Sequence, residues 1–311
     1  MKTNFASSLP SWKEKIKRTS YQFSAYRVSS MGATLFTYIM LIALSVIFLV
    51  PFIYMIGHSL MSVEDFINSN IKWLPRTLQF DNYAYAIRAL NYWPNLVKSL
   101  AITLLSVVAQ VFMCSFVGYG LARMNFKGKG IIFGTVLFSL IVPPQVILIP
   151  QYYLFSHMHM MNTYWPMIIP CFFSMGLNGG LFIYIFRQFY KGMPVELENA
   201  ALIDGTGSFG AYFRIMFPNA TSSILVTAIL SMVWQWNNYF EPSVYIQNAA
   251  DGTLTLQLSR LSEMASNNGA VTINGGISMA ATFLVVLPIL LIFFLIQRQF
   301  MQSIETSGLA N

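Results

Sequence analysis

Charged residues are scarce in this sequence: Asp, Glu, Lys and Arg make up 9% of its 311 residues, whereas 56% are hydrophobic. A chain with so little polar surface cannot cover a soluble globule, so the composition excludes the soluble classes and favours a bilayer protein. Cysteine is almost missing as well, with only Cys114 and Cys171 present. Both fall inside apolar stretches, where a thiol acts as a small hydrophobe, so we expect no disulfide.

Groups for metal binding and catalysis are also few. His157 and His159 have no third ligand nearby. Because zinc normally takes three or four protein ligands, we interpret both as interfacial polar residues and expect no metal site. The sequence has no Gly-x-x-x-x-Gly-Lys-Ser/Thr phosphate loop, which argues against ATP binding by this chain. Its apolar stretches hold no acidic residue, which argues against an ion-coupled secondary transporter and a membrane-embedded enzyme.

What the sequence does have is long apolar runs. A helix needs about 20 apolar residues to cross the hydrocarbon core, and helices satisfy their backbone hydrogen bonds internally. We therefore predict an all-α membrane protein with a basic tail at 1–31, a membrane domain at 32–300 and a short tail at 301–311. Its six predicted transmembrane helices cover residues 32–56, 96–122, 131–153, 163–186, 221–238 and 277–296.

The positions of Lys and Arg predict the orientation. With the N-terminus inside, 13 of the 18 basic residues lie on the inner side, and the net charge of +7 divides into +8 inside and −1 outside. Positively charged loops resist translocation, so both termini are expected in the cytoplasm. The cluster from Lys13 to Arg18 is expected to rest on the inner leaflet.

A polar stretch at 191–218 separates the fourth and fifth predicted spans on the inner side. Pro194 suits the first turn of a helix, and Glu196 and Glu198 place negative charge near the positive end of the helix dipole. Asp204 and Gly205 should end this helix, because glycine readily takes a left-handed cap. The stretch therefore begins with a short predicted helix that breaks at Gly205.

A second helix is predicted after the break. Ser208 would cap it, four apolar residues at helical spacing would form one face, and Pro218 would stop it. These four are Phe209, Tyr212, Phe213 and Met216. We predict an aromatic face toward the bundle or lipid and an acidic face with Ala200 and Ala201 toward a partner. The alternative is a helix pair lying on the inner leaflet; an anionic leaflet would repel the acidic face.

The residues of this stretch resemble the EAA loop of the permease subunits of binding-protein-dependent ABC importers. The resemblance rests on the run Glu198-Asn199-Ala200-Ala201, then Ile203-Asp204-Gly205, and the closing Arg214-Ile215-Met216-Phe217-Pro218. It implies that 191–218 is a cytoplasmic coupling loop that docks in a groove of an ATPase subunit. Asn199 stands where the family usually has glutamate, so Glu196 or Glu198 would have to supply a charge needed there.

Other segments extend the resemblance to the carbohydrate-uptake group, similar to the second membrane subunit of maltose and oligosaccharide importers. They are Trp73-Leu74-Pro75, Gly120-Leu121-Ala122-Arg123, Trp236-Asn237-Asn238-Tyr239 with Pro242, and Leu287-Pro288 through Gln297-Arg298. The resemblance implies a multi-pass protein of a bacterial or archaeal cell membrane that moves a sugar delivered by an extracellular binding protein. It implies a second, homologous permease and two ATPase subunits that bind ATP and Mg. A permease for a non-sugar solute and a secondary transporter are the alternatives.

Polar residues within spans are candidates for the transport path, because they are costly there unless they face a cavity or a neighbour. We expect Pro143 and Pro144 to kink the third span beside Gln145. Tryptophan at a span end and buried amides can equally serve as interfacial anchors and as links between helices. The candidates for the path are Gln110, Gln145, Asn178, Trp234, Gln235, Trp236, Asn237 and Asn238. The outer loop at 241–275 is the expected contact for the binding protein.

Overall fold

The computed structural model describes residues 12–68, 73–203, 205–249, 251–267 and 275–308, and the regular structure in these ranges is helical. The chain divides into two units, residues 1–57 and 58–311. The first unit consists of helix α1 (Trp12–Ser59), which ends just beyond the division. Its segment Ala33–Ser59 is long and apolar enough to cross a membrane. The predicted tail at 1–31 is thus helical from Trp12 onward.

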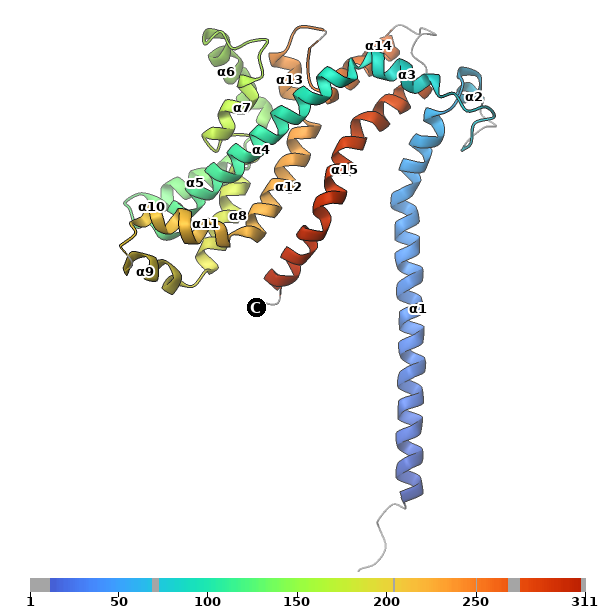
Figure 1. The fold of residues 1–311 in the computed structure, drawn as a ribbon, viewed down its shortest axis with the longest axis vertical. Helices are drawn as coiled ribbons and strands as arrows, with labels where there is room; N and C mark the ends of the chain where they lie inside the picture. The colour runs from blue at the N-terminus through green and yellow to red at the C-terminus, as the bar shows by residue number, and fades with distance from the viewer. Residues whose placement is uncertain (1–11, 69–72, 204, 250, 268–274, 309–311) are drawn as a thin grey trace, which may run out of the picture. The chain divides into compact units, whose positions relative to one another are not determined.

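The second unit holds the remaining helices (Figure 1), among which α4 buries a larger share of its apolar span than α15 does. In chain order these elements are α2 (Val63–Ile67), α3 (Asp81–Ala89), α4 (Tyr92–Arg123), α5 (Lys129–Ser139), α6 (Pro144–His157), α7 (Trp165–Phe172), α8 (Gly179–Gly192), α9 (Val195–Ile203), α10 (Ser208–Ala211), the π-helical turn η1 (Tyr212–Met216), α11 (Phe217–Asn219), α12 (Thr221–Asn237), α13 (Phe240–Tyr245), α14 (Leu254–Asn267) and α15 (Gly275–Gly308).

Three long unbroken helices coincide with predicted spans. Within the described residues, Ala33–Ser59, Tyr92–Arg123 and Gly275–Gln299 are long and apolar enough to cross a membrane. They coincide with the predictions at 32–56, 96–122 and 277–296. Two further pairs of bent helices bring the number to as many as five if each pair is one span. One of them ends in α12, which covers the prediction at 221–238.

The third predicted span is bent where the sequence places its prolines. Helices α5 and α6 meet at 101° across a short break. Pro143 is the extended residue that precedes α6, and Pro144 opens the helix. Proline has no N–H to donate and restricts the residue before it, so the helix cannot continue through the pair. The predicted kink is confirmed.

The prediction of one continuous helix at 163–186 is wrong. Helix α7 ends at Phe172, α8 begins at Gly179, and Ser174 and Asn178 between them have φ of 60° and 56°. The Gln110 side chain of α4 satisfies this open backbone by donating from Nε2 to the carbonyl of Leu177 over 2.8 Å. Irregular backbone within a membrane is tolerated where protein groups satisfy it in this way.

Helix α4 is the element around which the second unit packs. It lies against α8 and α12 (Figure 1), and buried polar and small residues line its contacts. Ser231 of α12 donates to Gln110 Oε1 over 2.5 Å. At Gly118, a Cβ atom would stand 2.7 Å from the Cβ of Phe186 on α8. Small residues of this kind let two membrane helices approach closely.

The close approach at Gly118 predicts a loss of stability for Gly118→Ala. The added methyl group would have to push α8 away, and such overpacking costs about 1–3 kcal/mol. This cost exceeds the gain of about 0.5–1 kcal/mol that alanine brings to a helix. We expect the thermal midpoint of the purified protein in detergent to fall by several degrees.

Gly134→Ala on α5 is the matched control, because its added Cβ would meet nothing within 4 Å. It should leave the midpoint unchanged or raise it. A midpoint for Gly118→Ala at or above that of the wild type would contradict the packing described for α4 and α8.

Candidate functional site

The polar stretch at 191–218 forms a helix, a glycine break and a second helix, as predicted. Helix α9 is followed by Gly205, whose φ of 81° is the left-handed conformation that favours glycine. Thr206 closes the end of α9, because its backbone N–H and its hydroxyl both donate to the carbonyl of Ala201. Asp204 lies outside the described residues. In Figure 1, α9 and α10 occupy one end of the second unit.

The predicted aromatic face of the second helix packs on α4. Phe209 stacks on Phe116 and Phe213 on Phe112, each with ring centroids 5.9 Å apart. Tyr212 is fully buried between them. These contacts fix α10 and η1 to α4.

Two details of the predicted second helix are wrong. Gly207 precedes the helix, and Ser208 is its first residue with no side-chain cap. Pro218 lies within α11 and does not stop the helix; the chain instead bends by 75° between Asn219 and Thr221 before α12 begins.

Helix α9 turns one face outward. Six of its residues are exposed, and four of these, Glu196, Asn199, Ala200 and Ile203, follow the spacing i, i+3, i+4 and i+7, which places them on one side of a helix. Val195 and Leu197 are exposed on either side of them. Ile203 is 85% exposed, whereas Ala201 is only 2% exposed. The expectation that both alanines form the partner face is therefore wrong for Ala201, which packs inside the chain.

Glu198 also points into the chain. Tyr119 of α4 donates from its hydroxyl to Glu198 Oε1 over 2.7 Å, and the Nε atom of Arg123 lies 3.7 Å from Glu198 Oε2. Among the two carboxylates that could replace the missing glutamate at Asn199, Glu198 is thus engaged within the chain. Glu196 is the one that stands on the exposed face.

The predicted path residues on α12 mostly pack between helices. Gln235 is buried and donates from Nε2 to Cys171 Sγ over 3.6 Å. Trp236 is buried and donates from Nε1 to the carbonyl of Val285 over 3.1 Å. The ring of Trp234 lies 5.6 Å from that of Phe182. These three side chains hold α12 to its neighbours, which is the alternative that the sequence left open.

The other predicted path residues are dispersed. Asn237 is exposed and bonds back to the carbonyl of Val233 in its own helix. Asn238 donates to Glu241 Oε2 over 2.8 Å. Gln145 is exposed on α6 and does not line the cavity described next. Asn178, at the start of α8, does line it.

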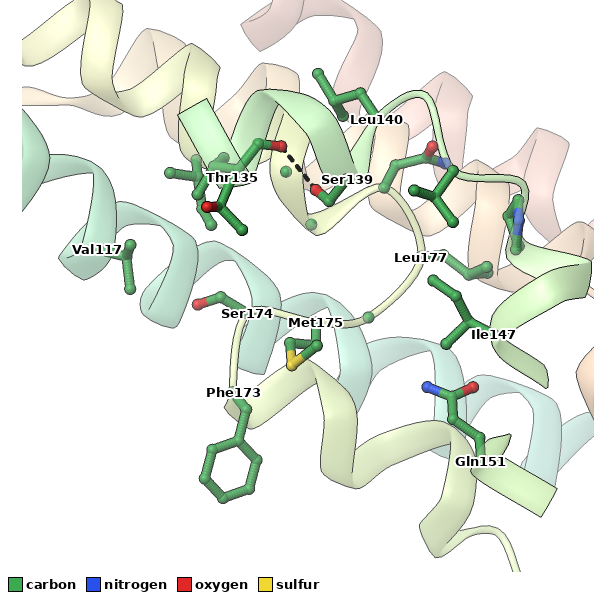
Figure 2. A pocket seen from close by; sticks show the side chains of 18 of the residues that line it. Val117, Thr135, Ser139, Leu140, Ile147, Gln151, Phe173, Ser174, Met175 and Leu177 are labelled. Carbon is green, nitrogen blue, oxygen red and sulfur yellow. Dashed lines mark hydrogen bonds between the residues drawn. The ribbon is translucent and has the colours of Figure 1, made fainter. Parts of the chain in front are cut away.

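A cavity of 510 Å³ adjoins the break between α7 and α8. Figure 2 shows Thr135 and Ser139 of α5, Ile147 and Gln151 of α6 and Ser174 of the break around it. Asn178 and Glu241 complete its polar lining. The structure thus gathers amide, hydroxyl and carboxyl groups from four segments beside an irregular backbone.

Five of these polar residues were not candidates from the sequence: Thr135, Ser139, Gln151, Ser174 and Glu241. Gln151 lies inside the predicted span 131–153, so the argument that selected Gln145 could have found it. Glu241 was assigned to the outer loop, and no local pattern brings it to the cavity. Helix α13 brings Glu241 to the cavity. Asn238 and Glu241 also bond to each other, and the Glu241 N–H donates to Asn238 Oδ1 over 3.3 Å.

The region predicted as an outer loop, 241–275, contains helices α13 and α14, while 268–274 lie outside the described residues. Arg260 of α14 donates to four backbone carbonyls that lie between the two helices, those of Ile246, Asn248, Ala249 and Asp251. Lys98 of α4 pairs with Asp251, and its hydrogen bond lowers the pKa of that carboxyl below the ordinary value. The described residues between α13 and α14 are therefore held by Arg260 and by Lys98 of α4.

This chain is similar to several known proteins. Residues 114–306 match the family model described as binding-protein-dependent transport system inner membrane component. The chain is 31% identical to the arabinooligosaccharides transport system permease protein AraQ of Bacillus subtilis over 294 residues, covering 94% of this chain and 98% of AraQ. It is 29% identical to the lactose transport system permease protein LacG of Rhizobium radiobacter, covering 81% of this chain and 88% of LacG.

A solved structure has the same fold. It is the crystal structure of a bacterial ABC transporter involved in the import of the acidic polysaccharide alginate, with a TM-score of 0.69 and 16% identity. The match covers 94% of this chain and all of the chain compared.

The partly buried carboxyl of Glu241 predicts a pH-dependent stability. Burial raises its pKa above the ordinary value of 4.5, and the hydrogen bond from Asn238 opposes the rise. The folded protein thus holds this proton to higher pH than the unfolded chain does, so ionisation costs stability as the pH rises above 4.5. Glu241→Gln should therefore raise the thermal midpoint at pH 7.5 and change it little at pH 4.5.

Glu263→Gln on α14 is the control, because it neutralises an exposed carboxyl. It should leave the midpoint near the wild-type value at both pH values. A Glu241→Gln variant that is less stable than the wild type at pH 7.5 would show that the ionised form stabilises the fold.

Proposed function

This chain belongs to the binding-protein-dependent transport system inner membrane components, the permease subunits of ABC importers, and we propose that it forms part of the membrane path for an oligosaccharide. The observation that carries the coupling part of this proposal is the exposed face of α9, which lies beside Gly205 and carries Ala200. A permease needs such a face to receive the work of ATP hydrolysis, which separate ATPase subunits carry out.

The sugar class rests on the relatives. AraQ is named for arabinooligosaccharides and LacG for lactose, and a further relative, AmyC of Thermoanaerobacterium thermosulfurigenes, for starch degradation products, at 27% identity over 85% of this chain and 92% of AmyC. A permease for another solute is the alternative. Binding of a glycan panel to the cognate binding protein separates the two, because a non-sugar permease would have a partner that binds none of them.

The proposed topology has six spans and both termini in the cytoplasm. Three unbroken helices and the two bent pairs support five of the spans. We count α7 and α8 as the remaining one, broken at 173–178. Irregular backbone within a membrane is tolerated where it is held by protein or lines a cavity, and this break does both. The basic inner side of the sequence supports the orientation.

Energy coupling follows from the arrangement of α9. Its exposed face, made of Glu196, Asn199, Ala200 and Ile203, would sit in a groove on an ATPase subunit. Because α10 and η1 are stacked on α4 through Phe209 and Phe213, a displacement of the loop would move the packed helices as a body. Closure of two ATPase subunits with bound ATP and Mg would then open the path alternately to either side.

The substrate path would pass the cavity beside the break. Amides and a carboxyl group there can bond the hydroxyls of a sugar, while the apolar lining contacts its C–H faces. A second, homologous permease would supply the rest of the path, and the segment between α13 and α14 would receive the extracellular binding protein.

Docking by the exposed face predicts that Ala200→Tyr abolishes transport. A bulky ring there would prevent α9 from entering a groove without disturbing packing within the chain, because Ala200 is exposed. We expect ATP-dependent uptake in proteoliposomes to fall at least about tenfold, and the ATPase to be lost on purification, since about 1.4 kcal/mol of interface energy is a tenfold change in affinity.

Ala200→Ser is the control for this variant, because it changes the same position by one hydroxyl and should keep both uptake and the ATPase. Uptake by Ala200→Tyr at the wild-type rate would contradict docking through this face.

A path through the cavity predicts that Gln151→Leu weakens transport while the complex stays assembled. The substitution keeps the volume of the side chain and removes its amide from the lining. Loss of a hydrogen bond to a sugar should lower uptake several-fold without changing the ATPase bound, because α9 is untouched. Uptake is measured with the glycan that the binding protein prefers.

Gln145→Leu on the same helix is the control for this variant, because Gln145 lies outside the cavity. It should have the smaller effect. If Gln145→Leu reduces uptake more than Gln151→Leu does, the path follows the other face of α6.

A further inference from the structure

Three segments meet at the C-terminal end of α4. Arg123, the last residue of that helix, donates from Nη2 to the carbonyl of Met193, which links α8 to α9. Its Nε atom faces Glu198 Oε2 of α9 at 3.7 Å. Tyr119, one turn earlier, donates to Glu198 Oε1 over 2.7 Å. One carboxylate is thus held from two positions of the same helix.

This junction is largely closed to solvent. The Arg123 side chain is 9% exposed and that of Glu198 15%, while Tyr119 is fully buried. The Tyr119 ring lies 5.7 Å from that of Tyr190 on α8 and 5.2 Å from that of Tyr212 on η1. An ion pair in such a place keeps its geometry better than one on the surface, because water and salt screen it less.

Helix α9 has few other side-chain interactions with the long helices. Six of its nine residues are exposed, and the left-handed Gly205 follows it. Among the α9 side chains that the structure describes, Glu198 alone has a hydrogen bond or ion pair to a transmembrane helix. A nine-residue helix attached by its ends and by the buried Ala201 could rotate under load. One hydrogen bond and one ion pair to the same carboxylate oppose that rotation.

We propose that Glu198 is a positioning residue that makes α9 move with α4, so that the work received by the loop reaches the spans. The inference rests on the proposed docking of α9 on an ATPase. Glu198 itself touches neither ATP nor the solute; it acts through Arg123 and Tyr119. Because α4 packs on α8 and α12, a rotation passed to it is passed to the helices around the cavity.

The test uses the complete importer in proteoliposomes with Glu198→Gln, Arg123→Gln and the double variant. Molecules of sugar taken up per ATP hydrolysed are counted, and the bound ATPase is quantified on purification. We expect each single variant to keep its ATPase and its hydrolysis but to lower the sugar-to-ATP ratio at least about fivefold, the lower end of common allosteric couplings. The double variant should be no worse than Arg123→Gln, which already loses the ion pair with Glu198 as well as the bond to the Met193 carbonyl.

Glu64→Gln on α2 is the control for the loss of one negative charge, since Glu64 is exposed and lies outside the junction. It should keep the wild-type ratio. Wild-type ratios for Glu198→Gln and Arg123→Gln would overturn the proposal, as would losses in the two single variants that add in the double variant. Either result leaves docking intact, whereas a wild-type chain that binds no ATPase would refute the proposed function itself.

Tyr119→Phe decides the matter if Glu198→Gln fails to assemble. It removes the hydroxyl and keeps the buried ring in the tyrosine cluster. A lowered sugar-to-ATP ratio in an assembled Tyr119→Phe complex supports the positioning role. A wild-type ratio in that complex would mean that Glu198 serves only to keep the loop folded.

Discussion

Polar groups inside a bilayer must find partners within the protein, and in this chain one helix supplies them. Gln110 of α4 holds the open backbone at Leu177 and receives Ser231 of α12. Several turns further along α4, near its C-terminal end, Tyr119 and Arg123 hold Glu198 of α9. Because water is excluded, each of these bonds would be costly to leave open. Helix α4 therefore fixes both the cavity beside the break and the loop at the end of the unit.

This shared support gives the two candidate sites a physical connection. The cavity is lined by residues of the break that Gln110 anchors, and α9 is tied to the same helix by Glu198. The close packing at Gly118 puts α4 and α8 in direct contact, so a displacement of one presses on the other. A motion that begins at α9 is thus expected to reach the cavity through packed helices, which are stiffer than a loop.

The lengths of the apolar runs and the positions of proline and glycine made part of this fold predictable. Apolar runs gave the helices at 32–56, 96–122 and 277–296, Pro143 and Pro144 gave the bend, and Gly205 gave the break in the polar loop. The break at 173–178 is held by the distant Gln110, so run length alone does not locate it. The adjacent Ala200 and Ala201 could not be separated by motif alone, yet they lie about 100° apart on a helix, and only packing decides which one faces inward.

Cysteine cross-linking tests the central claim most directly, which is that the outward face of α9 receives the ATPase. The native Cys114 and Cys171 are buried, so single cysteines placed at Ala200 and Ala201 can be compared within the assembled importer. The account predicts that Ala200→Cys links to the ATPase subunit and that Ala201→Cys, buried within the permease, does not. Equal linking from both positions, or linking from Ala201→Cys alone, would contradict it.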